Sequence, residues 1–491
     1  MADTRADIAF RKSTRTFPDA PQDTREEADS FGTRQIPAAA YWGINVRRAL
    51  DNFPISGRPI SVYPDFIFGY ACVKQAAARA NAELGVLDSK RADWIDRACE
   101  DIKAGNLRAQ FIVDIMQGGA GTSTNMNANE VIANRGLELA GLAKGSYANL
   151  DPNDHVNCGQ STNDTYPTAL KIGLSLSLER LLTELELLEH AFAAKARELA
   201  GILKVGRTQL QDAVPMTLEQ EFEAFAVTLA EDHASFVAVQ ECLWEVNLGA
   251  TAIGTGIAAD ARFAECARKH LAEITGLPIV TAPNLIEATS DVGVFMQLSG
   301  TLKRSAMKLS KICNDLRLLS SGPQAGFGEI KLPPRQAGSS IMPGKVNPVI
   351  PEVVNEVAFV VAGGDVTVTM AAEAGQLQIN AFLPVIGHML FENLQWLTAA
   401  ITTLRENCVK GITADEERLA RQMDSFVGVV TALIPHIGYG RASQIAKEAL
   451  ATNANVADLV VSAGLLTRAQ VSELIVAQTG AQRKAPPRSA E

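Results

Sequence analysis

The chain has 491 residues, of which 47% are hydrophobic and 20% charged, and its formal net charge is −10. This length is ample to bury a large core and predicts two to four domains. The acidic balance disfavours general nucleic-acid binding, which requires a basic surface, but leaves an anionic small substrate open because local charge decides such binding. Aromatic residues are scarce while alanine and leucine are common, which favours helices over sheets.

Seven cysteines are scattered without the spacing of a redox pair or of metal ligands, and the six histidines are also dispersed. We therefore expect reduced thiols in a cytoplasmic protein, and no metal site. The first 30 residues lack the apolar segment of a secretory signal, and we find no run of 18 predominantly apolar residues that predicts a membrane span. Residues 1–25 and 479–491 are predicted to be disordered tails.

Helical patterns dominate the chain between these tails. Residues 26–160 are expected to form an N-terminal domain of shorter helices, and residues 417–478 a small C-terminal helical domain. Between them, residues 161–416 carry five long patterns. In the first pattern, apolar residues recur from Leu174 to Leu199 in steps of three and four, which predicts a helix of seven turns that Asn163 and Asp164 cap. The other four are expected over residues 217–246, over residues 284–320, after VNPVIPE and after LPVIG.

Five successive helices of about 30 residues, each about 45 Å long, predict a helical bundle. Several of these helices carry apolar residues on more than one face. In the first helix, Leu182, Leu187 and Ala193 lie off the main apolar stripe. This excess predicts burial against other subunits, and a long bundle with a partly apolar solvent-facing surface is the alternative.

Four polar clusters interrupt this apolar pattern, and two of them lead directly into a helix. Helix starts offer unpaired N–H groups and the positive end of the helix dipole, which suit a carboxylate. Ordinary helix caps and tight turns are the alternative interpretation of each cluster taken alone. The four clusters are GGAGTSTNMNANE (Gly118–Glu130), GQSTNDTYP (Gly159–Pro167), GRTQLQDAVPMT (Gly206–Thr217) and GSSIMPGKVNP (Gly338–Pro348).

The last cluster lies in a segment of unusual charge. The 18 residues from Lys331 to Pro348 include Arg335 and Lys345 and have no acidic residue, so the segment carries a charge of +3. In an acidic chain, such a segment attracts anions. Gly338 and Gly344 give its backbone the freedom to open and close over a ligand.

GSSIMPGKVNP resembles the signature loop of the aspartase/fumarase superfamily, and the other three clusters occur in the order that this resemblance requires. The likeness extends from Phe31 to about residue 474. It implies an all-α fold of three helical domains, whose long central five-helix bundle assembles into a homotetramer with a twenty-helix core and shared active sites. It also implies a small-molecule dicarboxylate substrate and no organic cofactor, with neither nucleic acid nor membrane as a partner. Activation by a divalent metal at an unknown site stays open.

The resemblance also implies the chemistry. These enzymes remove a proton from the carbon beside a carboxylate and expel a group from the next carbon, which gives fumarate. Negative charge then builds on that carboxylate, and preorganised donors at helix starts stabilise it. By resemblance, Ser339 is the base, helped by a cationic, water-excluded pocket, and Lys345 contacts a substrate carboxylate. The residues implied to bind substrate are Thr122, Ser161, Thr162, Asn163, Thr208, Gln209, Ser340 and Asn347.

Position 209 separates the branches of the superfamily. Fumarases resemble GRTHLQDA here, with a histidine that handles water, whereas this chain has Gln209. Hydroxide requires a proton donor to leave, while ammonia leaves as a neutral molecule, so Gln209 favours deamination of L-aspartate over hydration of fumarate. KICNDLRLLSSGP and AAEAGQLQIN also resemble aspartases. A class II-type fumarate hydratase, more remotely an argininosuccinate-type lyase, and a non-catalytic structural relative are the alternatives.

Overall fold

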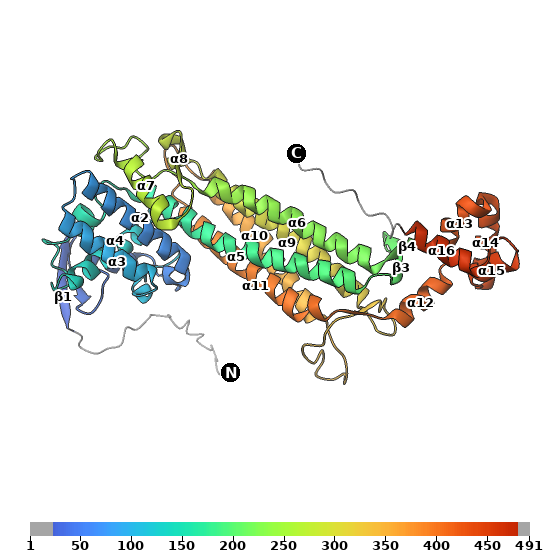
Figure 1. Ribbon diagram of the computed structural model, residues 1–491. Helices are drawn as coiled ribbons and strands as arrows, with labels where there is room; N and C mark the ends of the chain where they lie inside the picture. The colour runs from blue at the N-terminus through green and yellow to red at the C-terminus, as the bar shows by residue number, and fades with distance from the viewer. Residues whose placement is uncertain (1–22, 480–491) are drawn as a thin grey trace, which may run out of the picture.

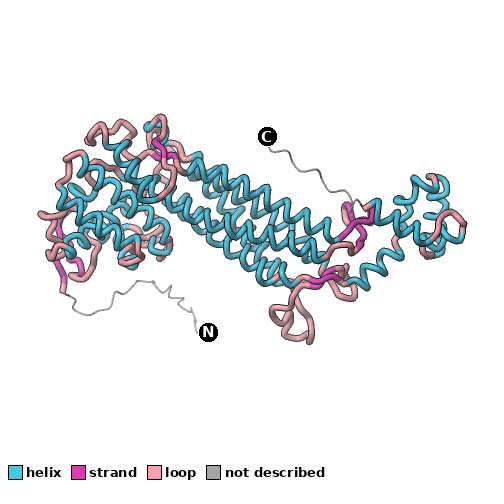
Figure 2. Tube along the Cα trace, in the orientation of Figure 1, coloured by secondary structure: helices cyan, strands magenta, loops and turns pink. Residues whose placement is uncertain are grey.

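The computed structural model describes residues 23–479, which form an elongated, mostly helical molecule (Figure 1). Shorter helices form a head at the N-terminal end, long helices form the middle, and a small group of helices follows at the other end. The strands in the described part make only two-stranded pairs, between long stretches of helix (Figure 2). The predicted all-α class is therefore confirmed. Most of both predicted tails, residues 1–22 and 480–491, falls outside the described residues.

The head begins inside the range predicted as a tail, because Thr24 already starts an antiparallel hairpin. Pro64 opens the longest helix of the head, where its fixed backbone angle suits a first turn. The elements of the head are β1 (Thr24–Asp29), β2 (Gly32–Pro37), α1 (Ile44–Asn52), η1 (Ile60–Val62), α2 (Pro64–Glu83), α3 (Ser89–Lys103), η2 (Arg108–Gln110), α4 (Thr122–Leu139) and η3 (Pro152–Val156).

Five long helices occupy the predicted segments. Ser161, rather than Asn163, caps the first of them: its hydroxyl accepts from the N–H of Asn163, while Asp164 completes a capping box. The predicted 284–320 helix is split, because Asp291 is extended and its carboxylate accepts from the N–H of Gly293. The long helices are α5 (Thr162–Glu198), α6 (Leu218–Leu243), α9 (Gly293–Leu319), α10 (Val349–Glu373) and α11 (Leu383–Asn407).

Short elements connect the long helices, and a separate helical group ends the described chain. The connecting elements are β3 (Leu203–Thr208), β4 (Gln211–Thr217), β5 (Glu245–Val246), α7 (Phe263–Thr275), β6 (Val280–Thr281), α8 (Leu285–Ser290), β7 (Ile330–Lys331), η4 (Val409–Gly411) and β8 (Thr413–Ala414). The terminal group comprises α12 (Glu416–Ser425), η5 (Val427–Val429), α13 (Val430–Ile437), α14 (Tyr439–Thr452), α15 (Val456–Ser462) and α16 (Arg468–Gln478).

A single hydrophobic core runs through the head and the bundle. Phe66 of α2 packs edge-on against Tyr166 of α5, which joins the two parts. Further along, Phe192 of α5 meets the α6 rings of Phe222 and Phe225. Each such buried ring contributes roughly 1.5–3 kcal/mol. Helices α13 to α16 have a core of their own, whereas Leu419 of α12 belongs to the main core.

Helix α10 leaves part of its apolar surface exposed. Phe359, Val366 and Met370 have exposed fractions of 63%, 58% and 68%. By length and composition α10 would be able to cross a membrane, with a mean hydropathy of 1.4, and it is the one such helix in the described part. Core helices pass the same test, and α10 packs along α9 and α11. Its remaining exposed apolar side chains therefore have no partner among residues 23–479.

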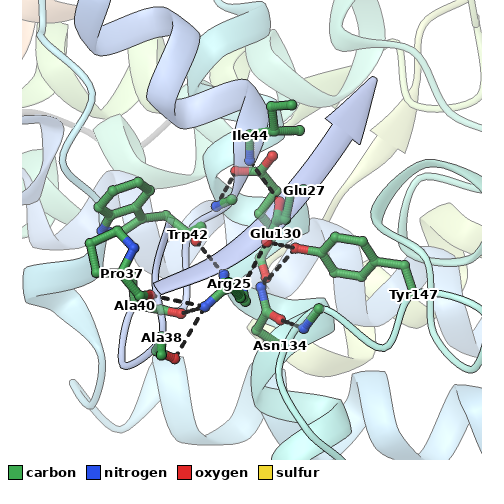
Figure 3. A network of polar contacts seen from close by, with 12 residues as sticks. Arg25, Glu27, Pro37, Ala38, Ala40, Trp42, Ile44, Glu130, Asn134 and Tyr147 are labelled. Carbon is green, nitrogen blue, oxygen red and sulfur yellow. Dashed lines mark hydrogen bonds and ion pairs between the residues drawn. The ribbon is translucent and has the colours of Figure 1, made fainter. Parts of the chain in front are cut away.

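A buried polar network fixes α4 against the N-terminal hairpin (Figure 3). Glu130 of α4 accepts from the N–H groups of Gly43 (2.6 Å) and Asn45 (2.8 Å) at the start of α1. Glu27 of β1 pairs with Arg25 and accepts from the Tyr147 hydroxyl at 3.0 Å. Arg25 also donates to four backbone carbonyls, those of Pro37, Ala38, Ala40 and Trp42.

This network predicts a pH-dependent stability. Burial raises the pKa of Glu130 to about 7, and the nearby Glu27 carboxylate adds to this shift. The N–H groups that donate to Glu130 act in the opposite direction and lower its pKa. In the folded protein the Glu130 carboxyl therefore keeps a proton that it loses above about pH 4.5 when the chain is unfolded. The stability of the fold thus falls as pH rises from about 4.5 to about 7. Relative to the wild type, Glu130→Gln should gain on the order of 3 kcal/mol over this window, because its amide does not titrate.

Urea unfolding at pH 5, 6, 7 and 8 measures this difference. Glu26→Gln serves as the control, since Glu26 is an exposed carboxylate on the same hairpin. It should follow the wild type at every pH. An equal pH slope for the wild type and Glu130→Gln would contradict the assignment.

Candidate functional site

Two of the four polar clusters meet at the head end of the bundle. Thr122 is the first residue of α4, and Ser161 caps α5, followed by Thr162 and Asn163. The hydroxyl of Thr165, one turn into α5, donates to the side-chain oxygen of Asn125 in α4 at 3.2 Å. The starts of two helices, each with its positive dipole end, thus lie beside one another, as a carboxylate site requires.

Gly121 allows this approach. Its φ is +90°, and a Cβ at this position would lie 2.0 Å from the ring of Tyr166 in α5. Tyr166 is buried and packs against α2, so it has little room to move. The glycine of the GAGTS sequence therefore has two roles, since it turns the chain into α4 and lets the helix start reach α5.

A buried lysine supports the turn that precedes α5. Lys74 of α2 donates to the side-chain oxygens of Asn157 (2.9 Å) and Gln160 (3.0 Å). Burial lowers the pKa of Lys74 to about 7, and the nearby Asp164 opposes this shift. The sequence analysis did not single out Lys74. Its signal was a lone lysine in the alanine-rich run ACVKQAAARA, where a charge requires buried partners.

Asp164 holds a loop that is distant in the sequence against the start of α5. Its buried carboxylate accepts from the N–H groups of Gly249 (3.1 Å) and Thr251 (2.9 Å), while the Asn163 side chain donates to the Ala252 carbonyl. Burial raises the pKa of Asp164 to about 6, and these N–H donors lower it. From the sequence, this loop is expected only to follow the helix predicted over residues 217–246, so its contact with Asp164 was not foreseen.

The cluster containing Thr208 and Gln209 forms the tip of the β3–β4 hairpin. Gln209 and Leu210 have φ values of +53° and +64°, a left-handed pair typical of a tight two-residue hairpin turn. This conformation is costly for residues other than glycine, and such strain concentrates at functional sites. Behind the tip, Arg207 and Lys204 pair with the buried Glu329, which anchors the hairpin.

The fourth cluster is a loop closed at its neck. The Gly338 N–H donates to the Lys345 carbonyl, and the Asn347 side chain donates to the Gly338 carbonyl, both at 2.8 Å. Inside the loop, the Ser339 hydroxyl oxygen accepts from the N–H groups of Ile341 (3.2 Å) and Met342 (3.1 Å). Two N–H dipoles aimed at this oxygen stabilise negative charge on it, as a basic serine requires.

The segment from Lys331 to Pro348 has three basic side chains, and only one of them has no partner in the described structure. Lys331 forms an ion pair with Asp415 at 2.9 Å, and Arg335 donates to the carbonyls of Glu406 and Asn407. Lys345 is exposed, and its side chain has neither an ion pair nor a hydrogen bond within residues 23–479. Of the three basic side chains between Lys331 and Pro348, Lys345 is therefore the one that is available to an anion.

Helix α5 separates the clusters into two pairs. It has 37 residues and is about 55 Å long. Ser161 begins it at the head, whereas the hairpin follows its other end (Figure 1). The loop also lies at that other end: its base strand β7 pairs with β8, and near β8 Lys195 of α5 donates to the Ile412 carbonyl. One chain therefore does not bring Ser339 or Gln209 to Ser161 and Thr122.

Comparisons with known proteins identify the family of this chain. A family model described as lyase matches residues 32–363, and one described as the fumarase C C-terminus matches residues 429–479. The chain belongs to this lyase family, the aspartase/fumarase superfamily. Within it, the chain is 55% identical over 452 residues to an aspartate ammonia-lyase of Pseudomonas canavaninivorans, covering 92% of this chain and 95% of that protein. It is 52% identical to the aspartate ammonia-lyase of Escherichia coli K12, with the same coverage.

Solved structures show the same fold. A fumarate lyase:delta crystallin from Brucella melitensis, bound to cobalt, has a TM-score of 0.90 and 52% identity and covers 92% of this chain and 98% of its own. A class II fumarase from Schistosoma mansoni has a TM-score of 0.87 and 32% identity, with the same coverage. The fold is thus shared with a class II fumarase, so it does not by itself separate deamination from hydration.

The contact between Gly121 and Tyr166 predicts a selective loss of stability. Gly121→Ala combines a left-handed backbone with a clash against a buried ring, so it should cost about 3 kcal/mol or more. The matched control is Gly141→Ala after α4, where φ is +74° but nothing lies within 4 Å, and the cost should be about 1 kcal/mol. Urea unfolding compares the two variants, and equal losses would show that the ring contact is unimportant.

Proposed function

We propose that this protein is an aspartate ammonia-lyase, a carbon-nitrogen lyase that reversibly converts L-aspartate to fumarate and ammonia. The observation that carries the proposal is the 52–56% identity to aspartate ammonia-lyases over 92% of the chain. The paired starts of α4 and α5 and the serine loop support it, because they offer the anion site and the base that this reaction requires.

The helix starts bind the carboxylate on which charge builds. Thr122, Ser161, Thr162 and Asn163 provide neutral hydroxyl and amide donors there, and Ser340 joins them from the loop. Removal of the Cβ proton spreads negative charge onto this carboxylate as an enediolate. Donors already held in place by the protein stabilise this charge without reorganising, which lowers the barrier. Lys74 and Asp164 keep both helix starts in position through the contacts described above.

Ser339 removes the proton once the loop closes over the substrate. In the closed site, Lys345 contacts a carboxylate and provides the positive charge that favours an ionised hydroxyl, together with the N–H groups of Ile341 and Met342. Asn347 and the hairpin residues Thr208 and Gln209 hold the other end of the substrate. Closure also excludes water, which strengthens each of these interactions.

Gln209 favours ammonia over water as the leaving group. An amide is a poor proton donor for a departing hydroxide, but an ammonium group leaves as neutral ammonia and needs none. Class II-type fumarate hydratase is the second candidate, because the Schistosoma mansoni class II fumarase shares the fold at 32% identity. The lower identity and the absence of a histidine at position 209 both count against it.

We further propose a homotetramer with shared active sites. The separation of the clusters by about 55 Å of helix supports it, since different chains must then supply Ser161 and Ser339. The unpartnered apolar side chains of the bundle would be buried in this assembly. The exposed apolar residues on α6, α9 and α10 are Val227, Val237, Met296, Met307, Leu318, Val353, Phe359, Val360, Val366 and Met370.

The reaction requires no organic cofactor, since every step is a proton transfer or a bond cleavage assisted by protein groups. Divalent-metal activation belongs to the same proposal, because the fumarate lyase:delta crystallin from Brucella melitensis was solved bound to cobalt. All seven cysteines are free thiols in the described part of the chain. This supports a reducing compartment such as the cytoplasm.

A direct assay tests the proposed substrate. Purified protein should form fumarate from L-aspartate, detected by ultraviolet absorbance, and should release ammonia in equal amounts. With L-malate, the rate should be at least about 100-fold lower, because no group at position 209 protonates hydroxide. Formation of fumarate from L-malate alone would instead support the hydratase. No turnover of either substrate would support the non-catalytic relative.

Subunit mixing tests the shared site. Ser339→Ala should lose turnover by about 1,000-fold or more, and Ser161→Ala should also be strongly impaired. When both variants are co-expressed in one cell, the hybrids should regain about a quarter of wild-type activity, because some sites combine an intact Ser339 from one chain with an intact Ser161 from another. A site contained within one chain would leave the hybrids inactive. Mixing the separately purified variants without dissociation is the control.

A further inference from the structure

A cluster of metal-binding side chains lies on the head, outside the proposed active site. Glu83 is the last residue of α2, and Cys266 and His270 are four residues apart on α7, so they share one face of that helix. The carboxylate, thiol and imidazole ligand atoms all lie within 4.8 Å of one another. The sequence predicted no metal site, because its cysteines are not spaced like metal ligands and its histidines are dispersed; the third member of this cluster, Glu83, lies 183 residues from Cys266 along the chain.

The imidazole is held between two carboxylates. His270 Nε2 lies 2.9 Å from Glu83 Oε2, and Nδ1 lies 3.6 Å from Glu273 Oε2, one turn along α7. The His270 side chain is 17% exposed, whereas Glu83 is 55% exposed and reaches the cluster from the solvent side. A carboxylate beside the second ring nitrogen is the usual partner of a metal-bound histidine, since it orients the ring and raises its basicity.

We propose that Glu83, Cys266 and His270 bind a zinc ion, with water as the fourth ligand. Zinc takes sulfur, nitrogen and oxygen donors in a tetrahedron, and these three side chains provide one of each. Calcium and magnesium prefer oxygen donors alone, so a thiol and an imidazole select against them. The cysteine and histidine come from one rigid helix and the carboxylate from another, so binding requires only side-chain adjustment.

Zinc at this site would clamp α7 onto α2. Two residues before Glu83, the Asn81 side chain donates to the Cys158 carbonyl at 2.8 Å, just ahead of the start of α5. On the other side, α7 follows the loop that Asp164 holds through Gly249 and Thr251. The ion would therefore stabilise both segments that flank the helix starts. This role is structural, and it holds whichever substrate the enzyme takes.

Zinc titration of the full-length protein tests the proposal. Protein treated with a chelator and dialysed is titrated with Zn²⁺ against a chromophoric competitor. We expect one zinc per chain and a higher midpoint of thermal unfolding when zinc is bound. Cys266→Ser and His270→Ala should each weaken binding by at least about 100-fold, and Glu273→Gln by about 10-fold. Cobalt in place of zinc should give a thiolate-to-metal charge-transfer band that Cys266→Ser removes.

Cys242→Ser is the matched control, because Cys242 is an exposed thiol on α6, outside this cluster. It should bind zinc and cobalt like the wild type. Glu83→Gln provides a third ligand variant should Cys266→Ser not fold, and it should weaken binding by a similar factor to His270→Ala. Zinc bound below one ion per chain, or unchanged affinity in both His270→Ala and Glu83→Gln, would overturn the proposal.

Discussion

The length of α5 is the constraint on which the active-site architecture depends. A continuous helix of 37 residues holds its first turn about 55 Å from its last. The helix starts proposed to bind the carboxylate lie at one end, and the serine loop and the hairpin lie at the other. Because a helix packed in a bundle cannot shorten, these groups meet only across chains. Assembly and catalysis are therefore coupled in the proposed function, and the unpartnered apolar side chains of α10 have a role in both.

Buried charges hold each half of the site in place. At the head, Lys74 and Asp164 are buried behind the helix starts, where their contacts join the turn before α5 to a loop nearly 90 residues later in the chain. At the other end, Glu329 is buried between Lys204 and Arg207 and anchors the hairpin. Removing a partner of such a buried group leaves it uncompensated, so these residues hold the proposed site in position.

Two features stay exposed where function requires mobility or access. Lys345 keeps an unpaired charge on a loop closed at its neck, while Lys331 pairs with Asp415 and Arg335 donates to backbone carbonyls. Gln209 adopts a strained left-handed conformation at a hairpin tip. The Glu83–Cys266–His270 cluster is only partly exposed and joins α2 to α7, so it is suited to stabilisation rather than to turnover.

Apolar periodicity and turn chemistry are local properties, so the helical class, the places of the long helices and the residue types of the four clusters could be predicted from the sequence. It also favoured deamination through Gln209, since leaving-group chemistry depends on one side chain. The folded structure added that Ser161 caps α5, that Lys331 pairs with Asp415, that Lys74 and Asp164 hold the segments around the start of α5, and that Glu83 meets Cys266 and His270. Those facts depend on contacts between residues far apart in the chain, and no local pattern specifies which distant partner a buried or charged side chain will find.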